Sequence, residues 1–209
     1  MQFKRDLAYT GFQLCMKGAL ACLGWYNILT FPEIFDHHGQ IKIIQMPYAT
    51  VTTCMFFICN CVDIHWHWNG NIMDIIHHVL GLLGTILCCG ISGFGINIIA
   101  ITSILETVAP IYQLLKLHTY SICIKKNKNF LRMIAIGINF FVRIPYCFWL
   151  GNVLIVQINV HNKGLDPYLQ INPFVCYMCL FNCLICIILD LIWSRNMLFA
   201  ICNNKTHNR

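Results

Sequence analysis

Six stretches of this chain are each long and apolar enough to cross a lipid bilayer. The hydrocarbon core of a bilayer is about 30 Å thick and a helix rises about 1.5 Å per residue, so a spanning helix needs about 20 mostly apolar residues. The six stretches are approximately residues 7–29, 47–66, 72–91, 93–117, 131–158 and 173–202. They predict an all-α fold, a polytopic transmembrane helical bundle of about six spanning helices, with residues 1–209 forming a single domain.

The composition agrees with this class of protein. Of the 209 residues, 58% are hydrophobic and 11% are charged, against about 45–50% and 25% in soluble domains. The net charge is +6, but the basic residues flank the apolar stretches and form no stripe that could follow a nucleic acid, so no nucleic-acid partner is expected. The 14 cysteines lie mostly inside apolar stretches, where we interpret them as small packing residues.

The distribution of basic residues predicts the orientation in the membrane. With six spans, both termini share one side with the second and fourth loops. That side carries Lys4, Arg5, Lys125, Lys126, Lys128, Arg195, Lys205 and Arg209, whereas the opposite loops carry Glu33, Asp36, Lys42, Lys163 and Asp166. Because cytosolic loops are enriched in lysine and arginine, we expect both termini to face the cytosol.

Ionisable residues inside apolar stretches indicate where function resides, since each costs a few kcal/mol in hydrocarbon and normally faces the bundle interior. The densest group surrounds the second loop: Asp63, His65, His67, Asp74, His77 and His78. On a helix, Asp74 reaches His77 at i+3 and His78 at i+4, so its carboxylate could orient an imidazole that acts as a general base or nucleophile.

The same group has a second interpretation, an interfacial cluster wetted by lipid headgroups, and the spacing does not favour either. For His65 and His67 the interfacial interpretation is the stronger, because they alternate with Trp66 and Trp68 and tryptophan is typical of the membrane interface. Imidazoles also bind metals, but the repeated multi-histidine boxes of membrane di-iron oxygenases are missing. We therefore expect no metal site and no cofactor.

A second pair of charges lies deeper in the predicted bundle. Glu106 precedes Leu117 by eleven residues and Arg143 follows Leu131 by twelve, so both lie about 17–18 Å from the same face. We expect them to pair, which would bring the fourth and fifth spans into contact. Pro110 and Pro145 are close by, and each can kink its helix and expose carbonyls to a polar cavity. A purely structural pair is the alternative.

Three stretches together resemble the TLC domain, the family named for the translocation-associated membrane, Lag1 and CLN8 proteins. The Asp63 region is followed by a paired-histidine segment, a glutamate-and-proline helix and a phenylalanine-rich helix ending in Arg-Ile. These are residues 73–84 (MDIIHHVLGLLG), 105–116 (LETVAPIYQLLK) and 140–144 (FFVRI). The resemblance covers most of the chain from about Leu7.

Ceramide synthases are the enzymatic branch of this family and transfer a fatty acyl group from acyl-CoA to a sphingoid amine. Their paired histidines match His77 and His78, but Thr102 and Ser103 stand where they carry a later His-Asp pair, with Glu106 in place of the next aspartate. Gly81 stands where they have threonine. The chain therefore resembles more closely the short, non-synthase TLC proteins, which are associated with membrane lipid composition or trafficking.

These observations lead to three hypotheses. The first is a protein of the endoplasmic reticulum or another endomembrane that binds or senses a membrane lipid, in a pocket lined by His77, His78 and Glu106 with Asp63 and Arg143 nearby. The second is an acyl-CoA-dependent N-acyltransferase with His77 or His78 as base or nucleophile, oriented by Asp74. The third is a cargo receptor or assembly partner of endoplasmic-reticulum proteins.

Overall fold

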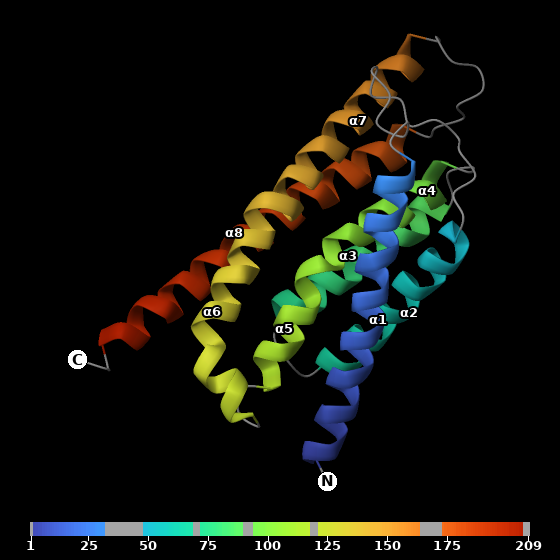
Figure 1. Ribbon diagram of the computed structural model, residues 1–209. Coiled ribbons are helices and arrows are strands. Elements are labelled where there is room, and N and C mark those ends of the chain that lie inside the picture. The colour runs from blue at the N-terminus through green and yellow to red at the C-terminus, as the bar shows by residue number, and fades with distance from the viewer. Residues whose placement is uncertain are drawn as a thin grey trace.

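Helices make up every element of the computed structural model, which describes residues 2–31, 48–68, 72–89, 94–117, 121–163 and 173–206. Within these ranges they form six rods that run in alternating directions through the bundle (Figure 1). Four rods are single helices, α1 (Gln2–Thr30), α2 (Ala49–His67), α3 (Ile72–Cys89) and α8 (Pro173–Thr206). Two are composite: α4 (Phe94–Thr102), η2 (Ser103–Val108) and α5 (Ala109–Lys116), and then α6 (Ile122–Ile138), η4 (Asn139–Arg143) and α7 (Ile144–Asn162).

Within the described residues, four segments are long and apolar enough to cross a membrane, judged by length and composition. They are Ile72–Cys89, Asn97–Lys116, Ile122–Val156 and Pro173–Asn203. The helices α1 and α2 also coincide with predicted spans but contain polar residues such as Lys17 and Asp63 along their length. The predicted helical bundle is therefore present, with four of its rods meeting the requirements of a span. The loops that carry Glu33, Asp36, Lys42 and Asp166 lie outside the described residues.

Polar side chains are buried in this bundle while large apolar ones are exposed. Asp63 is 1% exposed and Asp190 is 0% exposed, whereas Phe141 is 84% exposed. A soluble protein places charged residues almost exclusively at its surface. The reversal is expected of a bundle whose outer surface meets lipid and whose charges face one another.

The backbones of α1 and η2 approach each other closely at Gly24. A Cβ atom added to Gly24 would lie 2.8 Å from the carbonyl carbon of Ser103, and backbone cannot move aside as a flexible side chain can. We expect Gly24→Ala to lower the free energy of unfolding by about 1–3 kcal/mol, the usual range for overpacking. Thermal unfolding in mild detergent measures it. Gly18→Ala is the matched control in the same helix, since nothing lies within 4 Å of its added Cβ; equal shifts for both variants would contradict the prediction.

Candidate functional site

A cavity of about 360 Å³, which we call the polar chamber, is lined by the six residues that the hypotheses assigned to a pocket or active site. These are Asp63, Asp74, His77, His78, Glu106 and Arg143. Other polar side chains complete the wall, among them Lys17, His67, Tyr112, Gln113, Lys116, Arg132 and Asn196. The volume is within the range of about 300–1,000 Å³ that is usual for small-molecule sites.

The irregular turn η2 positions Glu106 in this wall. Pro110 has no N–H to donate to the carbonyl of Glu106, and the N–H of Ala109 donates to that carbonyl instead. In an α-helix the N–H of Ala109 would bond the carbonyl of Leu105. That carbonyl accepts from Arg143 Nη1 instead, at 2.6 Å. The 3-10 geometry of η2 therefore leaves the Leu105 carbonyl to accept from a side chain of another helix.

A widened turn, η4, positions Arg143 inside the bundle. It is one turn of π-helix, closed by a bond from the N–H of Ile144 to the carbonyl of Asn139, five residues back. Such turns are often found at functional sites. Both Asn139 and Arg143 are buried, and the Asn139 amide donates to Tyr112 Oη and to Ser194 Oγ, each at 3.0 Å. The turn thus directs two polar side chains of one rod into the bundle.

The prediction that Glu106 and Arg143 form an ion pair is wrong. Arg143 Nε lies 2.9 Å from both carboxylate oxygens of Asp190 on α8, while Glu106 Oε2 lies 3.9 Å from Lys17 Nζ. The predicted contact between the two rods is nevertheless present, through the bond from Arg143 to the Leu105 carbonyl. Asp190 was missed, although a carboxylate inside the last apolar stretch was a signal that could have identified it.

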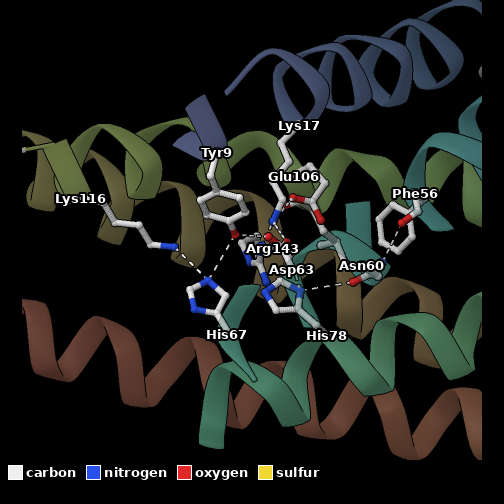
Figure 2. A network of polar contacts seen from close by, with 11 residues as sticks. Tyr9, Lys17, Phe56, Asn60, Asp63, His67, His78, Glu106, Lys116 and Arg143 are labelled. Carbon is white, nitrogen blue, oxygen red and sulfur yellow. Dashed lines mark hydrogen bonds and ion pairs between the residues drawn. The ribbon is translucent and has the colours of Figure 1, made fainter. Parts of the chain in front are cut away.

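Lys17 joins two carboxylates in the interior of the bundle. Its Nζ lies 2.6 Å from Asp63 Oδ2 and 3.9 Å from Glu106 Oε2. The hydroxyl of Tyr9 donates to the other oxygen of Asp63. Figure 2 shows the Lys17 ammonium between the two acidic side chains. Lys17 and Tyr9 were not among the predicted site residues, although a lysine inside the first apolar stretch was a visible signal.

Asp63 is the carboxylate that orients His78, where Asp74 was expected. His78 Nδ1 lies 3.4 Å from Asp63 Oδ2 and 3.3 Å from Asn60 Oδ1. Both neighbours are acceptors, because the Asn60 amide nitrogen already donates to the Phe56 carbonyl. In neutral His78 the proton is therefore on Nδ1 and the lone pair on Nε2. The prediction that Asp74 orients the histidine is wrong. Spacing along one helix identifies partners within that helix only, and Asp63 lies on the neighbouring helix α2.

The other three histidines of the predicted cluster divide between the chamber and the surface. The His77 ring centroid lies 5.1 Å from those of both His78 and Trp193, and its Nδ1 is buried without a hydrogen-bond partner in the described structure. His67, expected at the interface, lines the chamber with its Nε2 3.3 Å from Tyr9 Oη and 3.4 Å from Lys116 Nζ. His65 is exposed.

A second cavity of about 90 Å³, which we call the apolar cavity, shares three lining residues with the polar chamber. His77, Glu106 and Arg143 line both. Most of the remaining wall is apolar or thiol-bearing, including Phe56, Ile98, Leu150, Leu154, Cys88, Cys179 and Cys183. The two cavities therefore adjoin at the three shared residues, one lined by many ionisable side chains and the other mostly by apolar or thiol-bearing ones. An amphipathic ligand needs two such surroundings side by side.

Searches against protein-family models, curated proteins and solved structures found no match to this chain. Its function is therefore inferred from the geometry of the polar chamber and the apolar cavity.

Proposed function

We propose that this chain is a membrane protein of the TLC type that binds or senses a single lipid molecule between its helices. The observation that carries the proposal is that the polar chamber and the apolar cavity share His77, Glu106 and Arg143 in their walls. A lipid headgroup would occupy the chamber and its chain the apolar cavity. The order of the three TLC-like stretches in the sequence supports the same conclusion.

Unpartnered polar atoms support a polar ligand group in the chamber. His77 Nδ1 and Gln113 Oε1 both belong to chamber-lining residues, and both are buried without a hydrogen-bond partner in the described structure. Leaving a buried donor or acceptor unsatisfied costs about 1–3 kcal/mol. A ligand that hydrogen-bonds to these atoms would recover that free energy on binding.

The proposed topology has six spans with both termini in the cytosol, in the endoplasmic reticulum or another endomembrane. In Figure 1 the N-terminus lies at the same end of the bundle as the junction between α5 and α6. That junction is basic, with Lys116 in the last turn of α5 and Lys125, Lys126 and Lys128 in α6. Such enrichment is typical of the cytosolic side. Since Lys116 and Arg132 also line the chamber, its mouth would face the cytosol.

Mass spectrometry of lipids that co-purify with the protein in mild detergent tests the binding function. We expect one lipid class to be enriched over the membrane extract, and the enrichment to fall at least about fivefold in His77→Leu, because a buried polar partner is removed. His65→Leu is the matched control, since His65 is exposed. Bulk phospholipid in unchanged proportions in all three proteins would contradict lipid binding in the chamber.

A second candidate function is acyl-CoA-dependent N-acyl transfer, and the geometry of His78 favours it. The acceptor oxygens of Asp63 and Asn60 beside Nδ1 favour the tautomer with its proton there, which leaves Nε2 as the basic nitrogen that a general base needs. Loss of acyl transfer to an amine acceptor in His78→Ala would support the enzyme. An absence of turnover in the unmodified protein with a range of acyl-CoA and amine substrates would exclude it and leave the binding function.

A further inference from the structure

Lys17 is a buried primary amine whose presence in the chamber wall needs an explanation. It is 6% exposed and lines the polar chamber. Replacing a buried ion pair by well-packed apolar residues is often neutral or stabilising, so stability alone does not explain a lysine at this depth. Ionisable residues inside membrane segments are functional candidates for this reason.

The position of the amine is that of a nucleophile with two acid-base partners. Its nitrogen lies 2.6 Å from Asp63 and 3.9 Å from Glu106. Glu106 is one of the three residues that line both cavities, so the nitrogen is near the junction between the polar and apolar parts of the site. Figure 2 shows Lys17 extending from α1 towards Glu106 and Asp63.

We propose that Lys17 captures the carbonyl group of a long-chain aldehyde as a Schiff base, with the hydrocarbon chain in the apolar cavity. This rests on the proposed lipid-binding function and names a chemical class of ligand for the same site. Amines form Schiff bases with carbonyl compounds when a neighbouring group accepts their proton. An aldehyde on a long apolar chain matches a site in which an amine lies 3.9 Å from Glu106, a residue that also lines the apolar cavity.

The reaction balances within the chamber. Glu106 accepts a proton from the Lys17 ammonium, the neutral amine adds to the aldehyde carbon, and the carbonyl oxygen becomes a hydroxyl with the second amine proton. Glu106 then returns its proton to this hydroxyl, which leaves as water while the C=N bond forms. The net change is ammonium plus aldehyde to protonated imine plus water, with no oxidant or reductant.

The carboxylates around Lys17 stabilise the protonated imine as well as they stabilise the ammonium. A protonated imine carries the same single positive charge as the ammonium, so Asp63 and Glu106 remain paired with a cation. Asp63 is held in place by Tyr9 and by His78. Capture would therefore leave the buried charge balance unchanged, which is the main electrostatic requirement in an apolar surrounding.

Reductive trapping on the detergent-purified full chain tests the proposal. Hexadecanal is added with cyanoborohydride, which reduces the imine to a stable secondary amine, and the labelled lysine is located by peptide mass spectrometry. We expect Lys17 to be labelled at least about tenfold faster than the exposed Lys125 and Lys126, because binding of the chain holds the aldehyde beside the amine. Propanal at the same concentration should lose this preference.

Two variants separate a chemical role of Lys17 from a structural one. Lys17→Arg keeps the positive charge but forms no stable imine, so the selective label should disappear. Glu106→Gln keeps Lys17 but removes the proton acceptor, and should slow labelling at that residue. The comparison of lysines within the unmodified protein needs no variant, so the proposal remains testable if either variant fails to fold.

Labelling of Lys17 no faster than of Lys125, or equally fast with propanal, would overturn the proposal. Its failure is distinguishable from failure of the lipid-binding function. Enrichment of a co-purified lipid that depends on His77, without selective trapping at Lys17, would leave lipid binding supported and aldehyde capture refuted.

Discussion

Replacing Arg143 by leucine is expected to lower the free energy of unfolding by about 3–5 kcal/mol, the usual effect of breaking a buried ion pair. The carboxylate of Asp190 is fully buried and both its oxygens accept from Arg143, so the variant would retain an uncompensated charge in the bundle. The Leu105 carbonyl would also lose the bond that it accepts from Arg143. Thermal or denaturant unfolding in mild detergent measures the loss.

The double variant Arg143→Leu with Asp190→Leu is the informative control. Removing both charges should recover most of the lost stability, since apolar replacement of a buried pair is often nearly neutral. Arg195→Leu, which removes an exposed arginine of the same helix as Asp190, should change little. If the double variant were as unstable as the single one, the bond to Leu105 and the packing of the η4 turn would outweigh the ion pair.

Replacing Lys17 by methionine is expected to have an effect of similar size, about 3–5 kcal/mol, because a buried charge again loses its partner. Asp63 loses the ammonium at 2.6 Å and Glu106 loses the cation at 3.9 Å. Methionine approximates the length of the lysine side chain, so the change is chiefly one of charge. Unfolding in mild detergent is again the measurement, and Lys125→Met, at an exposed position of α6, is the matched control.

Adding Asp63→Asn to Lys17→Met should recover part of the loss. The asparagine keeps the shape of the side chain and removes the negative charge nearest to the missing ammonium. An unchanged unfolding temperature for Lys17→Met alone would contradict the prediction. It would show that the two carboxylates do not need this lysine to remain buried.

The placement of the helices could be predicted because burial in lipid imposes a minimum apolar length. Each of the six apolar stretches coincides with a rod, and the first, fifth and sixth rods extend beyond them into more polar sequence. The rod from α6 to α7 begins at Ile122, nine residues before the predicted span, because Lys125, Lys126 and Lys128 are compatible with a helix but not with a hydrocarbon surrounding. The apolar stretch therefore predicts which residues can lie in hydrocarbon, but not the residue at which the helix begins or ends.

The sequence was sufficient to predict that the ionisable residues line one cavity. It was not sufficient to predict which of them form ion pairs with one another. Sequence position fixes how far along its helix a residue lies, and this was sufficient to predict that Glu106 and Arg143 lie at a similar level, where both line the same cavities, but not that they form a pair. It does not fix how each helix is rotated about its axis or which third helix lies opposite. Arg143 therefore has Asp190 as its partner, and Asp63 replaces Asp74 as the carboxylate beside His78.

The π-turn at Asn139–Arg143 inserts the equivalent of one residue into an otherwise α-helical rod. One residue corresponds to a rotation of about 100° about the helix axis, so the inward-facing positions of α6 and α7 follow two registers that are out of step. A chain lacking one residue of this turn would continue as a straight α-helix. Only one of its two halves could then keep its buried face inside the bundle. Either Ala135 and Ile136 or Cys147 and Leu150 would rotate to the outer surface.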